Sequence, residues 1–468
     1  MKSRRSFHFI LLIFLVSLTL FTPSIANFKI GKIYEVSSPS LKSSGIFGTC
    51  ECYYPQIYID FENNIHTTWT LSEESDGMQK FILDYSKKPV NSTHWSDIKT
   101  LYAPIENIFE DAEFVIDKKE NLHLVWKEDL DYSSVYYRYW NTSKNKWNPI
   151  ETISDFNKAG SSKPRILVDN NFNAHIVWCD SSNYSGDGFE PNLLYRCKNA
   201  THGTWQSIEI LTLETNSSMR CNPTITFDSD YNIAVAWIDE SEVLYKLRYN
   251  NNGSWTNSSI ISTFSGNDCE EPKIACDAAN NIHFTWMEWA YHREVHYAKY
   301  IRNTSQIFHK IVYEGYLVDS PTMVLDQYGN IHIAWEDGSS DDVDICYRYK
   351  NISSETWSNI EIASKESTSH STYPSISIGT NDILHFVWSD LTDYNKTDYD
   401  FDIFYKSKNL TSGEWSTTIV LSLSINYDPL VQLIYILLGA SSVILIASLA
   451  FIIIRKRKNI ISKKKTST

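Results

Sequence analysis

Acidic residues recur at one fixed position in this chain, two residues after a tryptophan: Glu128, Asp180, Asp239, Glu288, Asp337 and Asp390. Carboxylates can accept hydrogen bonds from sugar hydroxyls, coordinate a cation, or act as acid and base on a bound substrate. Each of the six directly follows a strand-like segment, so we expect them to begin loops at one end of a repeated element. They are therefore candidate ligand-binding residues.

Two of these loops are especially acidic, and both are candidate calcium sites. Their additional acids are Asp341, Asp342 and Asp344 in one loop and Asp398 and Asp400 in the other. Calcium prefers several oxygen ligands, which such loops supply, but a solvated acidic loop has the same composition. The sequence identifies no other cofactor.

A repeat of about 53 residues positions these acids. Its central tryptophans are Trp69, Trp126, Trp178, Trp237, Trp286, Trp335 and Trp388. Fourteen residues before each of them stands a proline, replaced once by Ala112, and nine residues before stands an aspartate, replaced once by Gly379. Seven copies of one unit therefore make up most of the chain.

Each unit contains four strand-like segments, A to D, separated by turns rich in Asn, Asp, Gly and Ser. Four antiparallel strands in a repeat of this length are typical of a propeller blade. The sequence predicts an all-β fold, a seven-bladed β-propeller, with one C-terminal transmembrane helix in addition. Two segments could supply the last strand D and close the ring, residues 28–37 or residues 415–423.

With a tryptophan in strand B and another in strand D, the repeat resembles the sialidase-type propellers built from Asp-box repeats. The resemblance covers about residues 50–423 and includes an altered Asp box, Ser407 to Trp415. It implies a propeller fold and an extracellular setting. The catalytic motifs of that family are not found in this sequence, so no catalytic residue is carried over.

Six histidines lie three residues before the strand-B tryptophans: His66, His123, His175, His283, His332 and His385. A ring of histidines could bind metal. Because they lie on strands buried between blades, we expect core histidines that bond to the neighbouring A–B turn instead. The strand-A aspartates are expected to bond the backbone of those turns.

Eleven Asn-x-Ser/Thr triplets occur, and seven fall in successive C–D hairpins: Asn91, Asn141, Asn199, Asn252, Asn303, Asn351 and Asn409. They are candidate glycosylation sites, with ordinary turn asparagines as the alternative. In an A-to-D blade, C–D hairpins and B–C loops lie at opposite ends. We therefore expect glycans at one end of the ring and ligand at the other.

Eight cysteines in an exported domain favour disulfides. Cys179 and Cys197 are expected on adjacent strands of the third blade, and Cys221 and Cys269 in equivalent D–A loops. These are the two candidate bridges.

Both ends of the chain carry apolar runs with basic flanks. The pattern predicts a signal peptide at 1–26, an extracytoplasmic propeller at 27–429, a transmembrane helix at 430–454 and a basic cytoplasmic tail at 455–468. Removing the ten basic residues of the two ends from the formal charge of −14 leaves −24. Such a surface repels nucleic acid, so the expected partners are the membrane and an extracellular glycan or protein.

Three functions are compatible with these features. The first is a membrane-anchored cell-surface glycoprotein that binds a glycan or protein through its B–C loops without catalysis. The second is an exported sialidase-like glycoside hydrolase or lyase, in which two acids of the same face do the chemistry. The third is a structural cell-envelope protein.

Overall fold

The computed structural model describes residues 50–75, 78–104, 108–129, 133–154, 160–182, 191–212, 221–262, 266–340, 342–392 and 400–422. The predicted signal peptide, transmembrane helix and basic tail lie outside these ranges. Among the described residues, no helix has the length and apolar character needed to cross a membrane.

Within these ranges the chain forms seven antiparallel sheets in which four strands follow one another in sequential order, and in three of the sheets a short fifth strand pairs with the third. The first three sheets contain β1 (Cys50–Ile59), β2 (Ile65–Ser75), β3 (Met78–Lys88) and β4 (Lys99–Tyr102); β5 (Ile108–Ile116), β6 (Leu122–Asp129), β7 (Ser133–Asn141), β8 (Lys146–Trp147) and β9 (Glu151–Thr152); and β10 (Ser161–Val168), β11 (Ala174–Asp180), β12 (Asn192–Asn199), β13 (Thr204–Trp205) and β14 (Glu209–Ile210).

The other four sheets contain β15 (Thr224–Phe227), β16 (Ile233–Asp239), β17 (Glu242–Arg248) and β18 (Ser259–Ile260); β19 (Asp268–Cys276), β20 (Ile282–Trp289), β21 (Arg293–Ile301) and β22 (Gln306–Gly315); β23 (Val318–Leu325), β24 (Ile331–Asp337), β25 (Asp344–Asn351), β26 (Thr356–Trp357) and β27 (Glu361–Ile362); and β28 (Ser371–Ile378), β29 (Ile383–Asp390), β30 (Asp402–Asn409) and β31 (Ile419–Val420).

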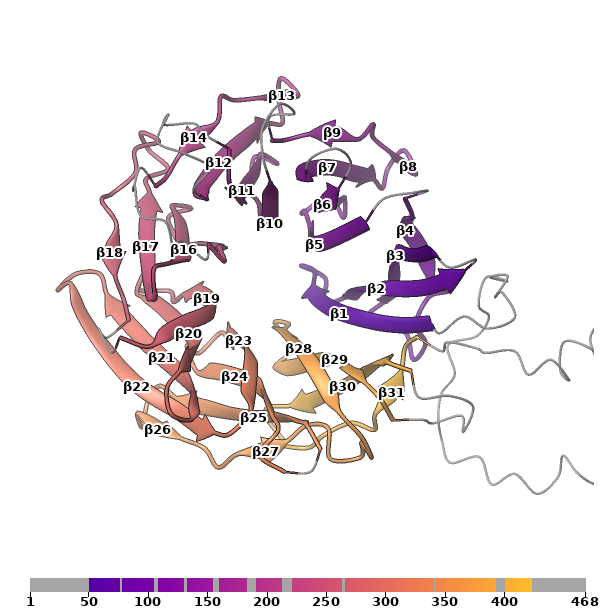
Figure 1. Ribbon diagram of the computed structural model, residues 1–468, viewed down its shortest axis with the longest axis vertical. Coiled ribbons are helices and arrows are strands. Elements are labelled where there is room, and N and C mark those ends of the chain that lie inside the picture. The colour runs from indigo at the N-terminus through magenta and orange to yellow at the C-terminus, as the bar shows by residue number, and fades with distance from the viewer. Residues whose placement is uncertain are drawn as a thin grey trace, which may run out of the picture.

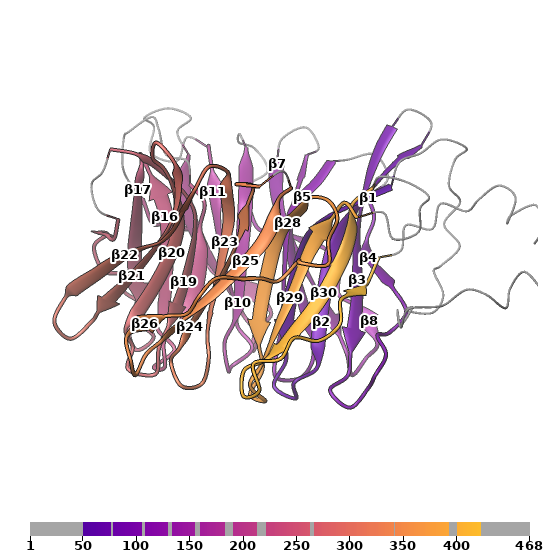
Figure 2. The same cartoon turned by 90° about the horizontal axis from the view of Figure 1, so that it is seen from below.

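The sheets are the blades of a closed ring, which confirms the predicted seven-bladed propeller. Strand A of each blade lies innermost and the later strands lie progressively outward (Figure 1). Seen from the side, the long strands run between the two faces of a disc (Figure 2). We call these faces the B–C face and the C–D face after the connections they carry.

The ring closes between the first and last blades. The Cys52 amide donates to the Phe401 carbonyl over 2.8 Å, and the rings of Trp95 and Tyr405 lie 5.0 Å apart edge to face. The seventh blade is completed by β31 from its own repeat, at residues 419–420. The other candidate closing segment, residues 28–37, lies outside the described residues.

The hydrophobic core lies between blades and is divided into seven clusters, one for each pair of neighbours. Every strand-B tryptophan is buried in one of them. Burying a side chain of this size contributes a few kcal/mol, and the sheet of one blade cannot cover both of its own faces. Ring closure is therefore what stabilises each blade.

The strand-B histidines are bonded core residues, as expected. In blade six, His332 Nδ1 lies 2.8 Å from the Tyr347 hydroxyl and Nε2 lies 3.4 Å from Asp326 Oδ2. Asp326 Oδ1 accepts from the amides of Tyr328 and Asn330 in the A–B turn. Four other strand-B histidines, His66, His123, His175 and His283, contact a strand-C tyrosine and a strand-A aspartate in the same way. The Asp–His–Tyr arrangement is therefore a structural element of the repeat rather than a metal ring.

The outer strands connect neighbouring blades through one further contact. The indole of a strand-D tryptophan donates to a glutamate of the preceding blade, over 2.7 Å from Trp205 to Glu151 and 2.8 Å from Trp415 to Glu361. A lysine of strand C pairs with the same acid: Lys408 Nζ lies 2.7 Å from Glu361. Trp255 makes the same contact with Glu209 over 2.8 Å, so these charge-assisted bonds account for tryptophan at three of the strand-D positions.

The disulfide connectivity differs from both candidate bridges. Cys179 is bonded to Cys221, with Cα atoms 5.9 Å apart, and joins blade three to blade four. Cys179 is paired with Leu193 across the β11–β12 ladder and Cys197 with His175, so the two cysteines of the predicted pair lie four positions apart, about 13 Å along the strand. Cys197 and Cys269 are free thiols.

Candidate binding site at the ring axis

The six post-tryptophan acids lie at or next to the end of strand B, as predicted, but their side chains point into the protein. Five are buried, and Asp337 is half-buried. Asp390 accepts hydrogen bonds from the Trp388 indole and from the Ser371 and Ser367 hydroxyls, at 2.8–2.9 Å. Asp180 has the same arrangement with Trp178 and Ser161.

Hydrogen bonds explain why these carboxylates can be buried. Five of the acids receive donors from their own tryptophan, from the segment that enters strand A, or from a neighbouring tyrosine, as Glu128 does from Tyr102 and Asp337 from Tyr313. A buried carboxylate is stable only with such partners. These acids therefore fix the start of strand A against strand B, which corrects their interpretation as an exposed ligand-binding series.

The candidate calcium residues do not form a site within the described part of the chain. Asp341 and Asp398 lie outside it. Asp342 is exposed, Asp344 accepts from the Ser364 hydroxyl over 2.8 Å, and Asp400 is buried. The only group of three or more possible ligand residues within reach of one ion, among the described residues, is Glu288, Glu294 and His296 in blade five.

All seven hairpin sequons lie in C–D connections, where the sequence places them. Several of these asparagines also bond their own turn. Asn141 Oδ1 accepts from the Lys144 amide over 2.9 Å, and Asn409 Oδ1 accepts from the amides of Thr411 and Ser412. Turn chemistry therefore accounts for asparagine at these positions, and glycosylation remains a prediction for them.

A feature that the sequence analysis missed lies at the ring axis. In six blades a non-glycine residue of strand A has φ near +50°: Tyr54, Asp111, Lys163, Glu271, Ser320 and Tyr373. Each interrupts the A–B register as a β-bulge next to the proline position. A bulge redirects its side chain, and a left-handed backbone is unfavourable for such residues, so these positions are constrained by their surroundings.

The bulges of blades one and seven bring aromatic side chains together at the axis. The rings of Tyr54 and Tyr373 lie 4.5 Å apart, and Tyr53 lies 5.2 Å from Phe401. Tyr54 is 59% exposed despite its position on the innermost strand (Figure 1). We call Tyr53, Tyr54, Tyr373 and Phe401 the axial aromatic cluster.

Acidic side chains of blades five and six adjoin this cluster. The Tyr373 amide donates to Glu336 Oε1 over 2.7 Å. Burial raises the pKa of Glu336 to about 7, although the Tyr373 amide opposes the shift. Burial, then Tyr54, and then the carboxylates of Glu336 and Glu271 raise the pKa of Tyr373. Blade six lies between blades five and seven, so the Glu271 charge acts on Tyr373 from a blade that is not its neighbour.

Two residues further along strand A, charged side chains of several blades approach one another. Arg165 Nε of blade three lies 3.8 Å from Glu113 Oε2 of blade two. Burial lowers the pKa of Lys273 in blade five, while the charges of Glu271 and Glu113 raise it and that of Arg165 lowers it. The axis thus combines one exposed and several half-buried aromatic rings with charges of both signs, a combination suited to a polar ligand with apolar faces.

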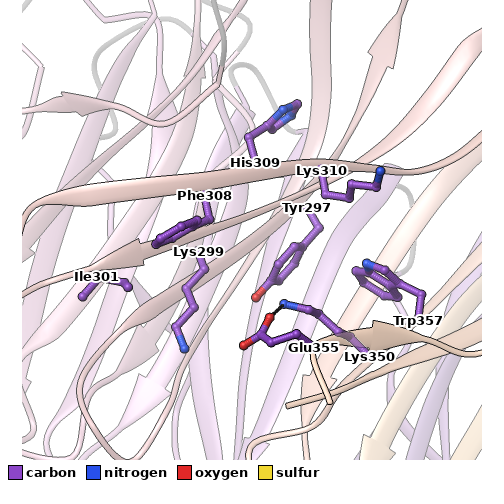
Figure 3. Close-up of a pocket in the computed structure, with 9 residues that line it drawn as sticks. All are labelled: Tyr297, Lys299, Ile301, Phe308, His309, Lys310, Lys350, Glu355 and Trp357. Atoms are coloured by element: carbon purple, nitrogen blue, oxygen red, sulfur yellow. Dashed lines mark hydrogen bonds and ion pairs between the residues drawn. The ribbon is translucent and has the colours of Figure 1, made fainter. Parts of the chain in front are cut away.

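A separate cavity of about 530 Å³ lies between the outer strands of blades five and six (Figure 3). Tyr297, Phe308 and Trp357 supply its aromatic lining, and Lys350 forms an ion pair with Glu355 beside it. It is flanked by the C–D hairpins that carry Asn303 and Asn351. Modification of these asparagines would crowd the cavity, which makes it a weaker candidate than the axis.

One sequence signal could have indicated the axial cluster. Proline recurs at one strand-A position in six of the seven blades, whereas the residue before it varies and is tyrosine in both Tyr54-Pro55 and Tyr373-Pro374. Variation at one position of a repeated unit is typical of a binding position rather than a packing one. The meeting of blades one and seven, however, follows only from ring closure.

The chain was compared with known proteins. No family model and no curated protein matches it. Solved structures that resemble it include an ulvan lyase of a new polysaccharide lyase family, at 12% identity and a TM-score of 0.50 over 67% of this chain and 85% of that one. Another is a sialidase of Streptococcus pneumoniae, at 10% identity and a TM-score of 0.40 over 77% and 67% of the two chains.

A protein of unknown function from Dyadobacter fermentans is also similar, at 9% identity and a TM-score of 0.46 over 64% of this chain and 94% of that one. Sialidase and polysaccharide lyase propellers are thus among the structural neighbours. At these identities the likeness shows the fold and nothing finer.

Proposed function

We propose that this protein is a membrane-anchored, extracytoplasmic recognition module that binds a glycan at the axial aromatic cluster without catalysing a reaction. The observation that carries the proposal is the pairing of Tyr54 and Tyr373, with ring centroids 4.5 Å apart and Tyr54 largely exposed. Tyr54 is exposed and Tyr373 is half-buried, so packing in the core does not account for a tyrosine at position 54.

The chemistry of the cluster suits a sugar ring. Tyrosine offers an apolar face to the C–H groups of a sugar and a hydroxyl for hydrogen bonding. Glu336 and Glu271, beside the pair, add carboxyl groups that can bond sugar hydroxyls. This combination of aromatic rings and a few polar groups is typical of small-ligand sites.

Other parts of the molecule are consistent with binding on this side. In blades five and six the bulge lies opposite the residue that follows the strand-B tryptophan, close to the B–C face. The hairpin sequons lie on the opposite face, so a glycan coat there would leave the axial cluster open. The uncharged segment 430–454 supports membrane anchorage, and six residues, 424–429, would separate it from the last blade segment.

Binding can be tested with the purified protein on a glycan array, followed by titration of any ligand found. Tyr54→Ala and Tyr373→Ala should each weaken binding at least tenfold, which corresponds to about 1.4 kcal/mol. Tyr328→Ala is the matched control, because Tyr328 is also an exposed tyrosine but lies in an A–B turn. Equal affinity of all three variants would refute the axial site, and failure to bind any glycan would favour a structural envelope protein.

Glu336 favours a second candidate, an exported glycoside hydrolase or lyase. A carboxyl group with a pKa of about 7 beside a tyrosine suits acid–base catalysis at neutral pH. Incubation of the protein with any bound polysaccharide and analysis of the products distinguishes the two functions. Cleavage that Glu336→Gln abolishes while binding persists would replace the recognition proposal by an enzymatic one.

A further inference from the structure

A buried group of carboxylates and imidazoles in blade five lies apart from the axial cluster. Glu288 is the second-last residue of β20, Glu294 and His296 lie on β21, and His309 lies on β22. Glu288 and His296 are each 2% exposed. We call these four residues the blade-five cluster.

The geometry brings three ligand atoms around one point. His296 Nε2 lies 2.7 Å from Glu294 Oε2 and 3.5 Å from Glu288 Oε2, and the ligand atoms of all three residues lie within 4.8 Å of one another. Ligands of a tetrahedral ion with bonds of 2.0–2.1 Å are separated by about 3.3 Å. Only small side-chain movements separate the observed positions from that arrangement.

The hydrogen bonding within the cluster is incomplete. A proton on His296 Nε2 can bond Glu294, but Glu288 Oε2 then has no hydrogen-bond partner although it is buried. The ion pairs of Glu288 and Glu294 among the described residues are both with His296. Glu288 and Glu294 can carry two negative charges, whereas His296 can carry at most one positive charge. A buried carboxylate whose charge is not neutralised is costly.

We propose that Glu288 Oε2, Glu294 Oε2 and His296 Nε2 bind a divalent transition-metal ion, zinc in the first instance. A dication neutralises both carboxylates and supplies Glu288 Oε2 with a partner. Imidazole nitrogen favours zinc over calcium and magnesium, which prefer oxygen-only sites. Three protein ligands leave a fourth position for water or another small ligand.

His309 is a positioning residue for this site. Its Nε2 lies 2.7 Å from His296 Nδ1, and the two rings stack 4.9 Å apart. Metal-binding histidines commonly donate their second N–H to a fixed acceptor, which holds the ring in the coordinating tautomer. His309 can accept that hydrogen bond and direct the lone pair of His296 Nε2 at the metal.

The other blades show that the cluster is a local substitution within the repeat. In blade two, Glu128 and Trp126 occupy the positions of Glu288 and Trp286, but their β7 partners are Ser134 and Tyr136 instead of Glu294 and His296. The Trp126 indole donates to Glu128 over 3.2 Å, whereas the Trp286 indole is without a partner. Glu288 therefore lacks the indole contact of its counterpart at Oε2, although Asn267 Nδ2 donates to its Oε1 over 3.0 Å.

The test measures zinc bound to the full chain, purified in detergent and freed of metal by a chelator. Elemental analysis after equilibration with ZnCl₂ should give one tightly bound zinc per chain, and excess CaCl₂ should not displace it. Glu294→Gln and His296→Tyr, the second of which copies blade two, should each lower zinc affinity at least a hundredfold. Zinc should raise the melting temperature of the wild type but not those of Glu294→Gln and His296→Tyr.

Two controls separate this site from general effects. Glu128→Gln changes the equivalent acid of blade two, and His202→Ala removes an exposed histidine; both should bind zinc as the wild type does. Variant folding is checked by circular dichroism. If Glu294→Gln does not fold, zinc binding is measured with His309→Ala instead. This variant is expected to bind zinc about tenfold more weakly than the wild type. Absence of stoichiometric zinc, or zinc retained by folded Glu294→Gln, overturns the proposal.

Discussion

The bridge between Cys179 and Cys221 gives a prediction whose magnitude follows from the chain. The two residues are separated by 42 positions. In the loop-entropy model, removing a crosslink over a loop of that length releases about 4 kcal/mol of unfolded-state entropy at 25 °C. The ring, residues 50–422, has an unfolding entropy of about 0.8 kcal/mol/K, so the double variant Cys179→Ala, Cys221→Ala should melt about 5 °C lower.

Calorimetry of the oxidised wild type and the variant measures this shift. Reduction of the wild type should reproduce it, because the crosslink rather than the sulfur atoms supplies the effect. Cys197→Ala is the control: Cys197 is also buried in the third blade but carries no bridge, so reductant should still lower the melting temperature of that variant. A peptide map that shows a disulfide between Cys179 and Cys197 would refute the reasoning. A double variant with the same melting temperature as the wild type would refute it as well.

Three further predictions concern single residues. Asp326→Ala removes an acceptor of hydrogen bonds of 2.7–2.9 Å from the Tyr328 amide and from the amide and side chain of Asn330, and should lower the free energy of unfolding in urea by about 3 kcal/mol; an unchanged midpoint would contradict this. Burial lowers the pKa of His385 to about 3, so as the pH falls this histidine becomes protonated in the unfolded state before it does in the folded state. Relative to His385→Gln, the wild type should lose about 1.4 kcal/mol per pH unit below pH 6.5, and a flat difference would count against it. Glu336 should show the opposite pH dependence, because its pKa of about 7 means that the folded state keeps the carboxyl proton to a higher pH than the unfolded state does. Relative to Glu336→Gln, the wild type should lose up to about 3 kcal/mol of stability as pH rises from 4.5 to 7, and a gain would refute the assignment.

Features that depend on local pattern were predictable. A tryptophan such as Trp335, with His332 three residues before it and Asp326 nine residues before it, has enough periodicity to fix strand B and the A–B turn. The roles of these histidines as core residues followed from strand alternation. Side-chain direction at the strand ends did not follow, because the donors that bury Asp390 come from Ser367 and Ser371, about twenty residues away in the chain.

The sequence by itself determined the seven repeats, their four strands and the end of each blade at which a residue lies, because a repeated strand pattern can bury its two faces only against copies of itself. Tertiary structure alone decided which residues meet. Cys179 bonds to Cys221 because the register of β11 and β12 places Cys197 too far along the strand. Tyr54 meets Tyr373 because closing the ring places the first and last blades side by side. Contacts between blades depend on register, twist and closure, and none of these is encoded in a single repeat.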